Sequence, residues 1–146
     1  MVNNQRFYLF LSLGVFMSVD LSAPVLVVDD QQTMRRIIEN LLKQLGFKTI
    51  VQAADGGAAL KTLRESAQNF MLVISDWNME PMSGMQFLKE VRTDAKLKDL
   101  PFIMVTAESK TENVVAAKQA GVNNYIVKPF SAETLKQKIT SVIGQF

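Results

Sequence analysis

The feature that most constrains the fold is a regular alternation of short apolar runs with longer segments of helical spacing. From Pro24 onward, five such runs are each followed by a turn and then by apolar residues three and four positions apart. Short apolar runs of this kind are typical of strands buried on both faces of a parallel sheet. We expect strands at residues 25–28, 49–53, 71–74, 102–105 and 125–127. The second run is the most polar, which favours a place at the edge of the sheet.

The segments between the runs have the signals of amphipathic helices. The first segment places one apolar stripe on Met34, Ile37, Ile38, Leu41, Leu42 and Leu45. Gly46 follows it, where a glycine commonly ends a helix. Capping residues precede the later helices: Asp55, Ser83 with Gln86, Ser109 with Glu112, and Ser131. Five strand–helix units predict an α/β fold, a parallel sheet with helices on both faces.

The composition excludes several classes of chemistry. The 146 residues include no cysteine and no histidine, so disulfides, thiolate or imidazole metal sites and phosphohistidine are ruled out. The formal net charge is +2, without a long run of Lys or Arg, and we therefore expect no nucleic acid as a partner. Any chemistry must come from carboxylates, hydroxyls, Lys, Arg, the backbone and a bound ion.

Polar residues stand where four of the five strands end. Asp29 and Asp30 follow the first strand, Asp76 follows the third, Thr106 the fourth and Lys128 the fifth. The carboxyl ends of parallel strands share one edge, which is where ligands bind in open α/β sheets. Carboxylates crowded together favour a cation, and oxygen ligands suit Mg²⁺. Together with a lysine and a hydroxyl they form a set suited to phosphoryl transfer to an aspartate.

Residues 24–146 resemble the receiver domains of two-component response regulators, and within them the single-domain chemotaxis regulators. The resemblance is carried by the segments Asp76-Trp77-Asn78-Met79, Thr106-Ala107-Glu108 and Tyr125-Ile126-Val127-Lys128-Pro129-Phe130. It implies a flavodoxin-like, doubly wound five-stranded sheet in the order 2-1-3-4-5. That order is known from established proteins, a chemotaxis regulator among them, and is not worked out from this sequence.

The resemblance also assigns roles to residues. It implies that Asp76 accepts the phosphoryl group and that Thr106 and Lys128 contact its oxygens. It implies Mg²⁺ bound by Asp30, Asp76 and the backbone carbonyl of Asn78, with Asp29 acting through water, and a cis peptide before Pro129. A switch and partner surface would comprise Val114, Lys118, Tyr125, Val127 and Lys138.

We therefore expect a signalling switch that supports its own phosphorylation and dephosphorylation rather than a metabolic enzyme. A histidine kinase would donate the phosphoryl group. Because no effector domain follows Phe146, output would occur by binding a protein such as a flagellar switch component or another phosphorelay protein, in chemotaxis or motility. One alternative is a Mg²⁺-dependent phosphatase or phosphotransferase, although these usually have a second aspartate where Asn78 stands. Another is a phosphate sink or a docking pseudo-receiver.

The first 22 residues form an apolar extension ahead of the receiver domain at residues 23–146. Arg6 precedes an apolar run, as in a signal peptide, but the run is short for a membrane span. We favour a true translation start at Met17, because the following sequence is typical of a cytoplasmic domain. An extension that packs on a partner is a further alternative. We expect no membrane insertion of the receiver domain.

Overall fold

A five-stranded parallel sheet forms the centre of the molecule, which the computed structural model describes over residues 19–107 and 110–146. Its strands are β1 (Val25–Val28), β2 (Ile50–Ala53), β3 (Leu72–Asp76), β4 (Phe102–Thr106) and β5 (Asn124–Val127). Their order is β2-β1-β3-β4-β5 and every pairing is parallel. The expected flavodoxin-like topology and the edge position of the second strand are confirmed.

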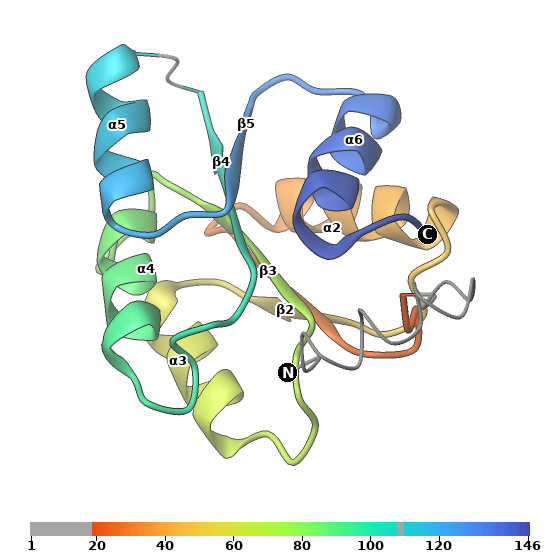
Figure 1. The fold of residues 1–146 in the computed structure, drawn as a ribbon, viewed down its shortest axis with the longest axis horizontal. Coiled ribbons are helices and arrows are strands. Elements are labelled where there is room, and N and C mark those ends of the chain that lie inside the picture. The colour runs from red at the N-terminus through yellow and green to blue at the C-terminus, as the bar shows by residue number, and fades with distance from the viewer. Residues whose placement is uncertain (1–18, 108–109) are drawn as a thin grey trace, which may run out of the picture.

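In the part of the chain that the structure describes, five helices cover the two faces of this sheet. They are α2 (Gln32–Gln44), α3 (Gly56–Glu65), α4 (Gly84–Thr93), α5 (Thr111–Gln119) and α6 (Ala132–Ile143). Helices α2 and α6 lie on one face, and α3, α4 and α5 lie on the other (Figure 1). Each face has its own apolar core, in which alternate side chains of the strands meet the helices. The three central strands are fully buried, which explains their uninterrupted apolar sequences.

The local signals in the sequence act largely as expected. Gly46 has φ +106°, and the N–H groups of Gly46 and Phe47 close the end of α2 by donating to the carbonyls of Lys43 and Leu42. The Asp55 carboxylate accepts the Ala58 N–H at 2.8 Å and so caps α3. Ser83 and Gln86 form the expected reciprocal capping box of α4. Ser131 caps α6 in the same way.

Two expectations about the helices were wrong. Ile37 is 46% exposed, because the buried side of α2 is centred on Ile38 and Leu42, and Ile37 lies outside it. The stripe read from the sequence was therefore too broad. Helix α5 begins at Thr111 with Lys110 as its N-cap, one residue later than the start that a capping box at Ser109 and Glu112 predicts. Ser109 itself lies outside the described residues.

Most of the predicted apolar extension, residues 1–18, also lies outside the described residues. Its last residues form a turn, in which Leu21 packs against the core beneath α2 and α6 and accepts a backbone hydrogen bond from Lys48. Over residues 19–107 and 110–146, no helix combines the length and the apolar character needed to cross a bilayer.

Candidate functional site

The carboxyl edge of the sheet brings together the polar residues that the sequence places at strand ends. Asp76 is the last residue of β3, and Thr106 is the last residue of β4. Asp29 and Asp30 follow β1, which pairs with β3, and Lys128 follows β5. The ends of β1 and β3 are adjacent because the strand order reverses between them, and the Lys128 side chain reaches Asp76 from beyond β4. The predicted convergence is thus present in the structure.

Lys128 is the centre of the site's geometry. Its Nζ lies 3.0 Å from Asp76 Oδ1 and 3.4 Å from Asp29 Oδ2. Asp29 and Asp76 are 1% and 6% exposed, whereas Asp30 is open to solvent. One carboxylate oxygen from each of the three aspartates lies within 4.8 Å of the others. The ammonium group therefore contacts two of the three acids, and the cluster retains an excess of negative charge.

The pKa values of Asp76 and Lys128 are both raised, although burial acts on them in opposite directions. Burial raises the pKa of Asp76; the hydrogen bond from Lys128 opposes this rise, and the charge of Asp29 adds to it. For Lys128, burial alone would lower the pKa, but the hydrogen bond and charge of Asp76, with the charge of Asp29, raise it overall. An isolated ion pair would lower the pKa of the acid. The raised pKa of Asp76 therefore shows that one lysine does not offset burial and a second carboxylate.

The acidic cluster fits a hard divalent cation. Carboxylate oxygens are the donors that Mg²⁺ prefers, and the exposed Asp30 leaves room for the waters that this ion usually retains. A cation among these oxygens would favour the ionised form of Asp76. The backbone at Asn78, the fourth predicted ligand, belongs to the exposed loop that directly follows β3.

Contacts with the backbone hold Asp29 in place. Its Oδ1 accepts the Gln31 N–H at 2.8 Å, and its carbonyl accepts a hydrogen bond from the Arg35 guanidinium at 2.7 Å. Arg35 also donates to the Gln52 side chain on the neighbouring strand β2. Arg35 could not be singled out from the sequence, since one arginine on a helix has no distinguishing pattern. Its position in the first turn of α2, behind an aspartate pair, is the only available signal.

A glycine allows α4 to begin directly beside Asp76. A Cβ atom on Gly84 would clash with the Asp76 carbonyl oxygen and lie 2.9 Å from both Met104 Sδ and Trp77 Cα. The Gly84 N–H donates to the Trp77 carbonyl at 2.8 Å, and the Trp77 N–H donates to Val105 at 2.9 Å. These bonds fix the backbone on both sides of the half-buried Trp77.

The predicted switch surface lies along α5, β5 and α6, where β5 is an edge strand between the two helices (Figure 1). Tyr125 is half-buried on β5, and Lys138 of α6 places its Nζ 5.1 Å from the centre of the Tyr125 ring. Val127 pairs in register with Thr106, which is 3% exposed. Val114 is half-buried and Lys118 is exposed on α5. Tyr125 and Val127 therefore lie on the strand that pairs with the end of β4 at Thr106, and this strand is also an outer edge of the sheet.

The peptide bond before Pro129 is cis, as expected, and so is the bond before Pro81.

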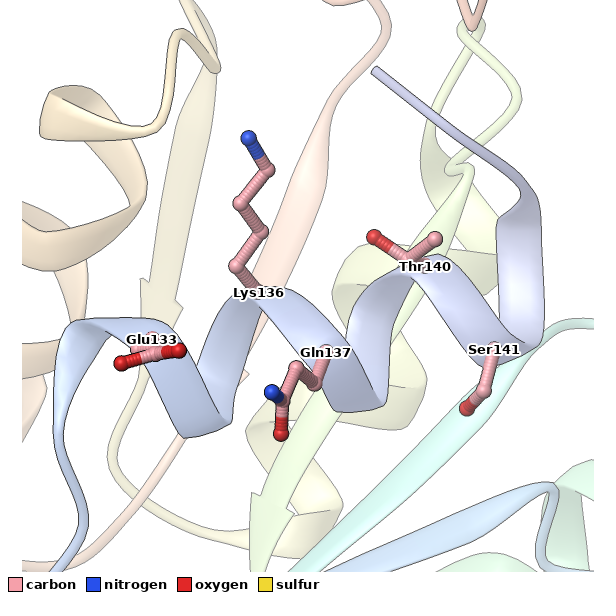
Figure 2. Close-up of a pocket in the computed structure, with 5 residues that line it drawn as sticks. All are labelled: Glu133, Lys136, Gln137, Thr140 and Ser141. Atoms are coloured by element: carbon pink, nitrogen blue, oxygen red, sulfur yellow. The ribbon is translucent and has the colours of Figure 1, made fainter.

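A separate surface hollow lies on α6 (Figure 2). It is lined by Glu133, Lys136, Gln137, Thr140 and Ser141. All five side chains come from a single helix, and none belongs to the carboxyl edge of the sheet. The hollow contains one acid and no group that faces it from a second element, so it lacks the convergent polar groups of a functional site.

Fold and site together define a class of protein: a doubly wound α/β domain with an acidic cluster and a lysine at the carboxyl edge of its sheet. Residues 25–140 match the response regulator receiver domain, and the chain belongs to that family. It is thus a receiver domain of two-component signalling, and the resemblance seen in its motifs is confirmed.

Several relatives are chemotaxis proteins. The chain is 51% identical over 118 residues to chemotaxis protein CheY-3 of Vibrio cholerae serotype O1, covering 81% of this chain and 89% of that one. Chemotaxis protein CheY of Pseudomonas aeruginosa is also 51% identical, with 81% and 94% covered. Among solved structures, Vibrio cholerae CheY4 at low pH superimposes with a TM-score of 0.76 at 36% identity, with 83% and 98% covered.

Proposed function

We propose that this receiver domain is a phosphorylation switch in which Asp76 accepts a phosphoryl group from the phosphohistidine of a histidine kinase. One observation carries the proposal: Lys128 Nζ contacts Asp76 at 3.0 Å inside a cluster of three carboxylates at the carboxyl edge of the sheet. A buried acid beside a fixed cation and further acids is suited to receive a charged group.

In the proposed reaction, an Asp76 carboxylate oxygen attacks phosphorus as the bond from phosphorus to the donor nitrogen breaks. The product is an acyl phosphate, and later attack by water releases inorganic phosphate and restores the carboxylate. Lys128 stabilises the charge on the phosphoryl oxygens, and the Thr106 hydroxyl donates a hydrogen bond to one of them. Both residues stand at neighbouring strand ends, so little rearrangement is needed to reach an oxygen on Asp76.

Mg²⁺ is the proposed cofactor, held by Asp30, Asp76 and the backbone carbonyl of Asn78, with Asp29 acting through water. When bound, the ion neutralises part of the charge that builds up on the transferring group. Asp30 contributes the most accessible carboxylate of the cluster, and Asp29 contributes negative charge from a buried position. A cation among these carboxylates would lower the raised pKa of Asp76 and so favour its ionised, nucleophilic form.

The proposed output is a change in affinity for a partner protein. Phosphorylation adds a charge of roughly −1.5 to −2, which draws Thr106 toward the phosphoryl group and opens space for Tyr125 to turn inward. This alters the surface formed by Val114, Lys118, Tyr125, Val127 and Lys138. We further propose that the protein acts in the cytoplasm, in chemotaxis or motility signalling, with a flagellar switch component or another phosphorelay protein as partner. The relatives that are named chemotaxis proteins support the chemotaxis part of this proposal.

Phosphorylation by a small donor tests the assignment of Asp76. With acetyl phosphate and Mg²⁺, intact-mass analysis should find one phosphoryl group on the wild-type protein and none on Asp76→Asn. Asp99→Asn is the matched control, because Asp99 is also an aspartate but is exposed and precedes β4, at the opposite end of the sheet. It should be modified like the wild type. An equal adduct on Asp76→Asn would show that another residue is the acceptor.

A further inference from the structure

The loop between β3 and α4, residues 77–83, is anchored to the protein interior by methionine side chains. Met79 is 5% exposed within the core on the α3–α4 side, and the half-buried Met82 packs against the same core. The intervening Glu80 and Pro81, and Asn78 before them, are exposed. The loop thus leaves Asn78, two residues after Asp76, exposed to solvent, while Met79 and Met82 pack into the core.

The Met82 side chain packs against the backbone of α3 at Gly56, which has no side chain. A Cβ atom on Gly56, the buried first residue of α3, would lie 2.7 Å from Met82 Sδ, 3.0 Å from its Cγ and 3.2 Å from its Cβ. The φ of Gly56 is outside the left-handed region, so the backbone does not itself require a glycine there. What the glycine provides is the space that the Met82 side chain occupies.

This contact links two helix starts that border the site. Helices α3 and α4 pack side by side, and each begins at the carboxyl edge of the sheet (Figure 1). Gly84 fixes the α4 end of the loop against Asp76, and Met82 on Gly56 fixes the segment just before it. The loop is therefore held at two points, at its α4 end beside Asp76 and at Met82 on Gly56.

We propose that Met82, seated on Gly56, is a positioning residue for the metal site: it sets where the Asn78 backbone lies relative to Asp30 and Asp76. The inference rests on the proposed function, in which the Asn78 carbonyl binds Mg²⁺. Mg²⁺ tolerates little departure from octahedral geometry at about 2.0–2.1 Å. A shift of a few tenths of an ångström in this loop is therefore sufficient to weaken binding.

The contact can be tested from both sides by a double-mutant cycle. Gly56→Ala adds a methyl group that displaces Met82, and Met82→Ala removes the side chain that Gly56 accommodates. Each change should weaken Mg²⁺ binding, measured by titration of Trp77 fluorescence, by about tenfold, as is typical when support for metal ligands is lost. In the double variant only the Cβ atom of residue 82 remains near the added methyl group, at 3.2 Å, and the two closer atoms are gone. Affinity should therefore fall little further than in Met82→Ala alone.

Matched variants separate positioning from general packing. Met85→Ala also removes a methionine that packs on the same core, but from within α4, so it should lower the unfolding temperature and leave Mg²⁺ affinity unchanged. Gly57→Ala should likewise leave it unchanged, because its Cβ would meet only Asp55 Oδ1, at 3.3 Å. Met82→Leu keeps the apolar volume and should bind Mg²⁺ within about twofold of wild type.

Amide hydrogen exchange in metal-free protein supplies a second measurement. Gly56→Ala and Met82→Ala should accelerate exchange at residues 78–80, whereas Met85→Ala should not. The inference is overturned if Gly56→Ala binds Mg²⁺ like the wild type, if the two single effects add in the double variant, or if Met85→Ala weakens binding equally. Failure of the proposed function looks different, because the wild-type protein would then show no Mg²⁺ response or no phosphorylation at Asp76.

Discussion

The acidic cluster should destabilise the metal-free protein, and Asp30→Ala tests this directly. The cluster has three carboxylates and one ammonium group, with carboxylate oxygens within 4.8 Å of one another. Two unit charges at that separation repel by about 0.9 kcal/mol in water and by about 3.5 kcal/mol at an effective dielectric constant of about 20. Since Asp30 is exposed and Lys128 offsets part of the repulsion, the lower value applies.

Asp30→Ala should therefore raise the free energy of unfolding of the metal-free protein by about 1 kcal/mol, or the midpoint temperature by about 4 °C. Alanine leaves no cavity, because the Asp30 side chain faces solvent. Saturating Mg²⁺ should reverse the order of stability. At a hundred times its dissociation constant the ion adds about 2.7 kcal/mol to the wild type, and it adds much less to a variant that has lost a ligand.

The assay is urea unfolding in EDTA and in Mg²⁺, for wild type, Asp30→Ala and Glu65→Ala. Glu65 ends α3 at the opposite edge of the sheet and is exposed, so its replacement should change neither stability nor the response to Mg²⁺. The reasoning is refuted if Asp30→Ala is less stable than wild type in EDTA, or if it gains as much stability from Mg²⁺ as the wild type does.

Three other predictions concern the backbone, the output and the N-terminus. Gly84→Ala should lower the free energy of unfolding in urea by at least about 3 kcal/mol, because its methyl group meets the Asp76 carbonyl and the Trp77 backbone, which cannot move aside. The control Gly57→Ala should stay within about 1 kcal/mol of wild type. Thr106→Ala should still be phosphorylated, if more slowly, yet lose most of the gain in partner affinity that beryllofluoride induces, a coupling of about 1–3 kcal/mol. Lys128→Arg should behave similarly. Full wild-type enhancement in Thr106→Ala would exclude coupling through Thr106 and Tyr125. A chain that starts at Met17 retains Leu21 and its core contacts, so its unfolding midpoint and Mg²⁺ response should equal those of the full chain, and a loss of either would contradict the proposed start.

The position of the candidate site could be predicted because its polar residues lie at the ends of strands. Asp29, Asp76, Thr106 and Lys128 each follow an apolar run, and a parallel sheet delivers all such positions to one edge. This inference requires only the direction of the strands, which the lengths of the intervening segments indicate. The adjacency of β1 and β3 came from the known strand order and was not a consequence of the sequence pattern.

What the sequence could not predict depends on contacts between distant segments. Periodicity placed Ile37 in the core, but the direction in which α2 faces the sheet is set by packing and leaves Ile37 exposed. Arg92 gave no signal, yet its half-buried guanidinium donates to the carbonyls of Lys98, Leu100 and Gly121 and so joins two loops. The contact between Gly56 and Met82 likewise joins residues 26 positions apart, with no motif to mark it.

Chemical mapping of the modified residue tests the central proposal most directly. The protein would be phosphorylated with acetyl phosphate and Mg²⁺, reduced with borohydride, which converts an aspartyl phosphate to homoserine, and then digested and sequenced by mass spectrometry. Homoserine at position 76, dependent on both phosphodonor and Mg²⁺, is the predicted result. Homoserine at position 29 or 30 instead, or no conversion at position 76 in a protein that has gained a phosphoryl group, would contradict it.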